Sequence, residues 1–281
     1  MNELLLAYTG MLKMSDTFRR EGETEKIRYC LDADYSALLS RYPLESVAGT
    51  GDDGDRAMRV LHWLSQHVFH NGDYDNHVND TALELLEYSF DREKSEGINC
   101  RGLSIILTEC LLALGIRART LYLLPLSPYD CDNHVITECW DTRRKKWIML
   151  DPTYDLYALK DGTPLSALEF RTALAGREEI VFNPEANYNG SPAEIDDDAR
   201  AYYAKNLFRF RVNSVQGPEG ECGKGGTAVE IAPVGFDARR AGVANVDFRI
   251  SLAGEEDWLL DWRREEEGRD CVYQDLTYLY S

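Results

Sequence analysis

One run of apolar residues limits what this chain can fold into more than any other feature. It begins at Cys100 and follows the spacing of one helical face, with Gly115 where a helix commonly ends; its members are Leu103, Ile106, Leu107, Cys110, Leu111 and Leu114. A helix with so wide an apolar face needs other elements to cover it. The pattern therefore predicts a buried helix over 100–114 that begins at Cys100.

Extended segments follow this helix. Residues 118–124 have the composition of a strand. Residues 134–140 and 146–150 flank the polar turn Asp141-Thr142-Arg143-Arg144, as the two strands of a β-hairpin do. The sequence therefore places a hairpin directly after the buried helix and its first strand.

The rest of the chain is expected to mix helices and strands. Residues 1–50 are interpreted as helical, and further helices are expected at 57–68, 81–90, 165–175 and 199–206. Strands are expected at 207–212, 228–231, 246–252 and 272–280, and a solvated loop at 263–270. This order predicts an α+β fold in which N-terminal helices pack on an antiparallel sheet.

Charge and composition limit the partners. The 281 residues include 31 Lys+Arg and 49 Asp+Glu, a net charge of −18 that repels phosphate backbones and anionic lipid. We expect no nucleic acid and no membrane as partner, because no stretch is long and apolar enough to span a bilayer. The apolar run at Leu4–Ala7 is too short for a signal peptide, which favours the cytoplasm. The oligomeric state stays open.

The cysteine count indicates thiols rather than a disulfide framework. The number is odd and low for a chain of this length, so we expect thiols throughout: Cys30, Cys100, Cys110, Cys131, Cys139, Cys222 and Cys271.

The hairpin brings a histidine and an aspartate together. With residues 141–144 as its loop, Trp140 faces Lys145, and counting back along both strands places His134 opposite Asp151. Side chains paired in this way share one face of the sheet, about 5 Å apart at Cβ. A carboxylate beside an imidazole orients one ring nitrogen and stabilises the imidazolium.

Cys100 is the natural nucleophile for this pair. It lies at a predicted helix N-terminus, where the helix dipole favours a thiolate. Backbone N–H groups there have no helical acceptor and can donate to a developing oxyanion. Cys100, His134 and Asp151 would together form a nucleophilic triad.

These motifs resemble the core of the transglutaminase-like superfamily. The likeness rests on Asn99-Cys100-Arg101-Gly102-Leu103, Ala113-Leu114-Gly115-Ile116-Arg117-Ala118-Arg119, Asn133-His134-Val135, Trp147 and Asp151-Pro152-Thr153. It implies a papain-like fold with Cys100 as nucleophile, His134 as general base and Asp151 as the residue that orients it. Arg117 stands where the family often has proline. We expect a single domain over 1–281, with its catalytic core at about 55–160 and a β-rich extension of the sheet at 200–281.

The side chain that assists the oxyanion in papain-like folds has no clear counterpart here. The candidates are Trp63, Gln66, Asn71 and Asn76. The stretch His70-Asn71-Gly72 also resembles bacterial members of the family, without an assigned role.

Each of these residues also has a purely structural interpretation. Cys100 could be a small buried hydrophobe, His134 a satisfied core histidine, and Asp151 a turn residue before Pro152. Cys131 and His134 have C-x-x-H spacing, but no second pair of zinc ligands follows. The acidic run at Asp52–Asp55 lacks the ligand spacing of an EF-hand. We therefore expect no metal and no cofactor.

The function predicted from these residues is thiolate attack on an amide or ester of a peptide or protein. Water as acceptor gives a peptidase or amidase, which is the favoured outcome, and an amine acceptor gives cross-linking. The alternatives are a module that keeps the fold only to bind peptides or proteins, and an amidase that acts on N-glycans.

Overall fold

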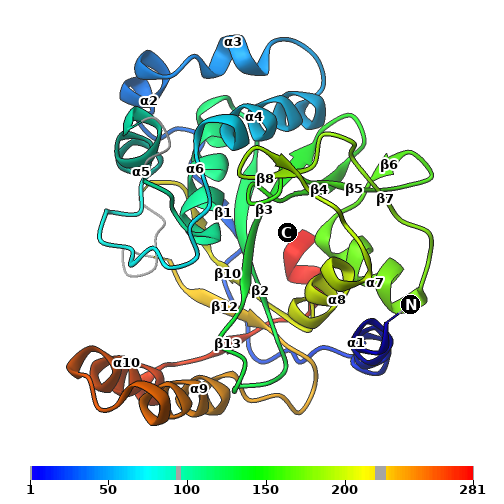
Figure 1. The fold of residues 1–281 in the computed structure, drawn as a ribbon, viewed down its shortest axis with the longest axis vertical. Helices are drawn as coiled ribbons and strands as arrows, with labels where there is room; N and C mark the ends of the chain where they lie inside the picture. The colour runs from blue at the N-terminus through cyan, green and yellow to red at the C-terminus, as the bar shows by residue number, and fades with distance from the viewer. Residues whose placement is uncertain (1, 93–95, 219–225, 281) are drawn as a thin grey trace.

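A six-stranded mixed sheet forms the centre of the computed structural model, which describes residues 2–92, 96–218 and 226–280 (Figure 1). Its strands run in the order β13-β12-β10-β2-β3-β4, and each neighbouring pair is antiparallel except β12 and β13. The strands are β2 (Ala118–Leu124), β3 (His134–Asp141), β4 (Lys146–Leu150), β10 (Arg209–Asn213), β12 (Ala228–Ile231) and β13 (Val272–Tyr273). The mixture of helices and strands agrees with the α+β class.

Helices cover both faces of this sheet. They are α1 (Glu3–Met14), α2 (Ser36–Arg41), α3 (Leu44–Ala48), α4 (Asp53–His67), α5 (Ala82–Ser89), α6 (Cys100–Ala113), α7 (Ala167–Gly176), α8 (Asp197–Asn206), α9 (Ala238–Ala253) and α10 (Asp257–Gly268). One apolar cluster joins α2 to α6 with Cys139 and Ile148, and a second joins α1, α7 and α8 with Ile136 and Met149. Successive strand residues therefore bury their side chains on opposite faces.

Short strands complete the structure. They are β1 (Arg28–Tyr29), β5 (Ala158–Lys160), β6 (Thr163–Pro164), β7 (Val181–Phe182), β8 (Asn187–Tyr188), β9 (Ser191–Pro192) and β11 (Val215–Gln216). Among them, β1 pairs with β11, β5 with β6 and β7, and β8 with β9.

The buried helix forms where its apolar spacing predicts. The side chain of Asn99 caps α6 by accepting a hydrogen bond from the backbone N–H of Gly102 at 3.0 Å. Gly115 adopts a φ of 75° just beyond the helix, a conformation that favours glycine. Two hydroxyls attach α6 to the sheet, because Ser104 donates to the carbonyl of Val135 and Thr137 donates to the carbonyl of Ser104. Cys100 is thereby held beside the first residues of β3.

The β3–β4 hairpin does not have the predicted register. Asp141 faces Lys146 and Trp140 faces Trp147, so the loop is 142–145 rather than 141–144. Asp141 accepts hydrogen bonds from the backbone and side chain of Arg144, and these close the turn one residue later. Because the pairing shifts by an even number of residues, every side chain keeps its face of the sheet. His134 and Asp151 become diagonal neighbours instead of opposite ones.

Three other predictions are wrong. Residues 246–252 lie in α9 and 263–268 in α10, not in a strand and a loop. The short alternation of apolar and polar residues in 246–252 fits either structure, and the cap from Asp237 to Arg240 and the packing of α10 favour the helix. Residues 15–35 are largely extended rather than helical, since Arg28 and Cys30 bond to the β11 segment.

The C-terminal part does extend the sheet, through β10, β12 and β13, but it also contains α9 and α10 and is not simply β-rich. These two helices lie against each other and project from the body of the molecule (Figure 1). Residues 274–280 form a 3₁₀ turn at Leu276–Tyr280 rather than the end of a long strand. The single domain over 1–281 stays a prediction.

A buried ion pair connects β2, β3, α7 and the C-terminal turn. The guanidinium of Arg119 donates to Glu138 at 2.5 and 3.0 Å and to the carbonyl of Leu279, and both charged side chains are 1% exposed. The other oxygen of Glu138 accepts the backbone N–H of Ala167 at 2.8 Å. Each charge therefore depends on the other for its solvation.

We predict that Arg119→Met lowers the free energy of unfolding by about 3–5 kcal/mol, because it leaves the Glu138 carboxylate buried without its partner. Urea denaturation measures the loss. The double variant Arg119→Met, Glu138→Gln keeps an acceptor for Ala167 and should recover part of the stability. A loss below about 1 kcal/mol in the single variant would show that the pair is not needed.

Candidate active site

His134 and Asp151 form a buried pair. His134 is the first residue of β3 and Asp151 directly follows β4, and the two side chains are 2% and 0% exposed. The Nε2 atom of His134 lies 2.6 Å from Oδ2 of Asp151. This contact leaves Nδ1 as the ring nitrogen that faces the thiol of Cys100, with which His134 also shares a hydrogen bond.

The three groups shift one another's acidity. Burial alone would raise the pKa of the Cys100 thiol, but hydrogen bonds to His134 and His70 and the charge of His134 lower this pKa to about 6. Burial alone would lower the pKa of His134, but the charge and hydrogen bond of Asp151 raise it to about 10. The same imidazolium holds the pKa of Asp151 below its usual value. Between about pH 6 and pH 10, Cys100 is therefore a thiolate and His134 an imidazolium.

Asp151 is held by more than the histidine. Its Oδ2 atom also accepts the hydroxyl of Tyr203 at 2.5 Å, and its Oδ1 atom accepts the backbone N–H of Thr153 at 2.9 Å. Tyr203 comes from α8, and its ring meets that of His134 edge-on at 5.8 Å. Sequence reasoning did not identify Tyr203, because it lies 52 residues beyond Asp151 and belongs to no motif.

The site opens into a cavity of about 540 Å³. Its lining comes from the N-terminus of α6, the segments around β2 and β3, the loop at 70–76, and α8 to α10; it includes His70, Asn76, Asn99, Cys100, Arg101, Tyr122, Asp132, His134, Thr153, Tyr154, Tyr202, Arg211, Arg249 and Trp262. In the part of the chain that the structure describes, the buried hydroxyl of Thr153 has no hydrogen-bond partner.

His70 is the second histidine at the thiol. Its backbone N–H and carbonyl both bond to the side chain of Asn189, at 2.7 and 3.0 Å, and its Nδ1 lies 3.1 Å from the hydroxyl of Tyr188. The neighbouring carbonyl of Phe69 accepts the N–H of Ile98. The signal for this residue was present in the sequence as His70-Asn71-Gly72, but nothing there placed it beside Cys100.

The four candidates for the oxyanion side chain separate into two groups. Asn76 lines the cavity, where its Oδ1 accepts from Asn99 at 2.9 Å. The other three do not line it. Trp63 is buried against Tyr42 and Phe90, Gln66 contacts His62, and Asn71 caps the turn at Asp73.

The described residues also bear on metal and membrane binding. Within 2–92, 96–218 and 226–280, no three His, Cys, Asp or Glu side chains gather as a metal site would require. Over the same ranges no helix combines the length and apolarity needed to cross a bilayer. Cys100, Cys110, Cys131, Cys139 and Cys271 carry thiols, and Cys222 lies outside the described residues.

Residues 41–152 match the model of the transglutaminase-like superfamily, which usually comprises cysteine-dependent enzymes. The chain is therefore similar to that superfamily over this segment. The matched segment contains Cys100, His134 and Asp151 and ends before α7. No curated protein and no solved structure matches the chain.

We predict that Asp151→Asn raises the pKa of the Cys100 thiol from about 6 toward its ordinary value. The amide has no charge to keep His134 protonated, so the thiolate loses its cation. The rate of iodoacetamide alkylation at pH 7 should fall at least about tenfold. Asp132→Asn is the matched control, since it removes a carboxylate from the cavity lining without touching His134. An unchanged pKa in Asp151→Asn would contradict the assigned pair.

We also predict that His70→Ala raises the pKa of Cys100, because it removes one of the hydrogen bonds that lower it. A neutral or charged imidazole can donate to a thiolate, so the effect should be smaller than that of Asp151→Asn. The pH dependence of alkylation measures both. His77→Ala is a suitable control, since this exposed histidine bonds to Asp75 outside the cavity lining. Equal pKa values in the two histidine variants would remove His70 from the site.

Proposed function

We propose that this protein is a cysteine-dependent acyl-transfer enzyme that hydrolyses an amide or ester, with Cys100, His134 and Asp151 as its catalytic triad. One observation carries the proposal: the Cys100 thiol, with a pKa of about 6, hydrogen-bonds to a histidine whose pKa is about 10. A buried cysteine kept only for packing has its thiol pKa raised, as Cys110 and Cys139 do.

In the proposed reaction the Cys100 thiolate attacks the carbonyl carbon of the substrate. The electron pair of the C=O bond moves to oxygen, and backbone N–H groups at the start of α6 stabilise the charge. Those of Cys100 and Arg101 have no acceptor within the helix, whereas that of Gly102 is taken by Asn99. His134 donates its proton to the leaving amine or alkoxide as the bond breaks, which leaves a thioester on Cys100.

Water then completes the cycle. Neutral His134 takes a proton from water as its oxygen attacks the thioester, and the acid product leaves as the C–S bond breaks. Asp151 keeps its charge throughout, because three hydrogen bonds stabilise it. A cavity of about 540 Å³ has the size of a small-ligand site. This size favours water over a second protein as the acceptor, and therefore hydrolysis over cross-linking.

We predict a bell-shaped dependence of kcat/KM on pH, with limbs near 6 and 10. Activity should rise with pH as Cys100 loses its proton, and should fall at higher pH as His134 loses the proton that the leaving group needs. Alkylation of Cys100 needs only the thiolate, so its rate should rise near pH 6 and then stay level. Peptide mapping of the alkylated protein, with His134→Ala as comparison, identifies the residue.

The outcomes separate the enzyme from a binding module. An ordinary or raised pKa of Cys100 that does not change in His134→Ala would overturn the enzyme and leave the fold as a peptide- or protein-binding module. Mass spectrometry of the protein with an activated ester should detect a thioester on Cys100 that is absent in Cys100→Ala. Decay of this thioester to the acid in the presence of an added primary amine supports hydrolysis, whereas formation of the amide supports cross-linking.

A further inference from the structure

Arginines line the cavity of this strongly acidic protein. The net charge of the chain is −18, yet Arg101, Arg211 and Arg249 all face the same 540 Å³ space as Cys100. Arg101 is neutralised by Asp80, with which it makes two hydrogen bonds, and Arg211 by Glu230 at 2.6 Å. These two guanidinium groups therefore add little net charge.

Arg249 is different. Its guanidinium donates to the carbonyl of Cys131 at 2.8 Å and to the side chain of Asn245 at 3.1 Å, and it lies over the ring of Trp262 at 5.3 Å. Its partners are neutral: within the described ranges, no carboxylate lies at ion-pair distance from it. These contacts fix the position of the cation and leave its charge uncompensated.

A smaller pocket continues from the cavity. It measures about 110 Å³, shares Arg211, Arg249 and Trp262 with the cavity, and is also lined by Arg209. Arg209 is buried, and its Nε atom has no hydrogen-bond partner among the described residues; the Oε2 atom of Glu266, which also lines this pocket, has none there either. A buried donor without an acceptor costs free energy until a ligand supplies one.

Apart from the reacting groups Cys100, His134 and Asp151, the charges around the two spaces sum to one positive charge. Arg209, Arg211 and Arg269 surround two carboxylates, Glu230 and Glu266. Lys205 bridges two others, Asp130 and Asp132. These groups cancel, so Arg249 is the excess cation. A single carboxylate balances it, whereas a doubly charged phosphate would leave a charge without a partner in a partly desolvated place.

We propose that Arg249 and the adjoining pocket bind one carboxylate of the acyl donor, so that the enzyme selects acidic amides such as peptides with a glutamate or aspartate side chain near the scissile bond. The inference rests on the proposed function and names its substrate class. It also assigns a role to the two projecting helices, because α9 supplies Arg249 and α10 supplies Trp262.

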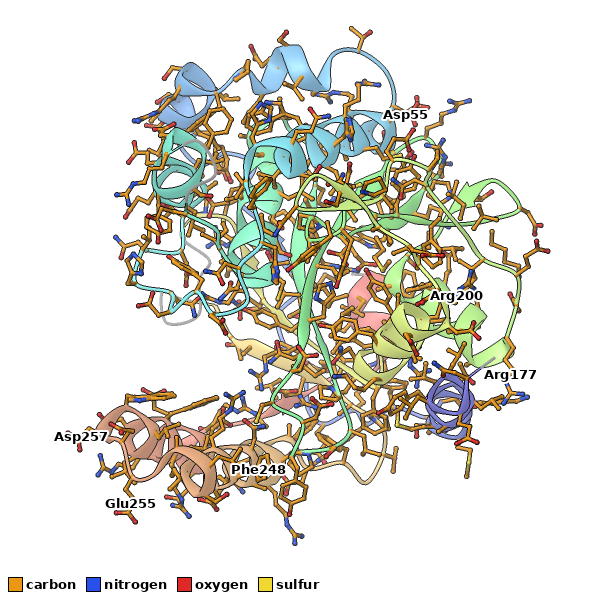
Figure 2. The ribbon with its side chains drawn as sticks, viewed as in Figure 1. Asp55, Arg177, Arg200, Phe248, Glu255 and Asp257 are labelled. Carbon is orange, nitrogen blue, oxygen red and sulfur yellow. The ribbon has the colours of Figure 1, made fainter. Side chains whose placement is uncertain are left out.

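The way in which α9 and α10 attach to the body of the molecule agrees with this role. Figure 2 shows Glu255 and Asp257 at its outer end, and Phe248 closer to the body of the molecule. Phe248 meets the ring of Tyr129 at 5.5 Å, and Asn245 donates to the carbonyl of Pro128 at 2.8 Å. The inner end of α9 is therefore attached to the segment that leads into β3 and His134.

Paired alkylating reagents test the carboxylate site without a known substrate. N-iodoacetylglycine and N-iodoacetylglycinamide differ by one negative charge, and homologues with longer spacers vary the distance from sulfur to carboxylate. For the best spacer we expect the anionic reagent to alkylate Cys100 about tenfold faster than its neutral twin, as a charge-assisted hydrogen bond allows. In Arg249→Gln this ratio should fall to about two.

The controls isolate Arg249. His134 also attracts anions, and its contribution remains in Arg249→Gln. Arg263→Gln removes an arginine of α10 that pairs with Asp247 and Glu267 outside the cavity, and should keep the full ratio. Arg249→Lys keeps the charge and should keep part of the ratio. Thermal unfolding of each variant shows whether it is folded.

The result distinguishes the two proposals. Rapid alkylation of Cys100 with equal ratios in the native protein and in Arg249→Gln would overturn the carboxylate site and leave the enzyme proposal intact. Failure of both reagents to alkylate Cys100 would overturn the enzyme. Calorimetric titration of Cys100→Ala then decides the site by itself: acetyl-glycyl-glutamate amide should bind about tenfold more tightly than the glutamine peptide, and equal binding would overturn the inference.

Discussion

The rest of this site depends on the hydrogen bonds and the ion pair of the buried Asp151 carboxylate. A charge with no exposure to water is stable only when hydrogen bonds and an opposite charge replace its hydration. Three donors do so here: the His134 ring, the Tyr203 hydroxyl and the Thr153 backbone. Because these donors belong to β3, α8 and the turn after β4, the charge holds three elements in place. His134 in turn keeps Cys100 ionised.

The core of the site could be predicted because its signals are local. The helix that begins at Cys100 has its own cap, apolar face and terminal glycine, and the strands on either side of 142–145 have clear composition. Even the wrong register placed His134 and Asp151 on the same face of the sheet, since an even shift preserves the face of each side chain. That prediction depended on the two-residue alternation of side chains along a strand and not on the exact position of the turn.

Other features depend on contacts that no local pattern records. Tyr203 and His70 contact Asp151 and Cys100 from segments far apart in the sequence. Tyr203 belongs to no motif, and the motif His70-Asn71-Gly72 does not show which residue His70 contacts. Residues 246–252 alternate like a strand, but they become helical because α10 packs beside them. Short alternations fit both periods, so the tertiary partner decides between them.

In the proposed function, the reacting groups and the residue that selects the substrate lie in different parts of the chain. Cys100, His134 and Asp151 lie within residues 41–152, the segment that matches the superfamily. Tyr203 and Arg249 lie beyond it. Tyr203 supplies one of the hydrogen bonds that keep Asp151 charged, so the matched segment alone would hold its carboxylate less well. Arg249 lines the cavity without a carboxylate at ion-pair distance among the described residues, so under the proposal changes in α9 and α10 would alter which acyl donor is bound. The two C-terminal helices are thus the place where an acidic protein can present one unbalanced cation to a ligand.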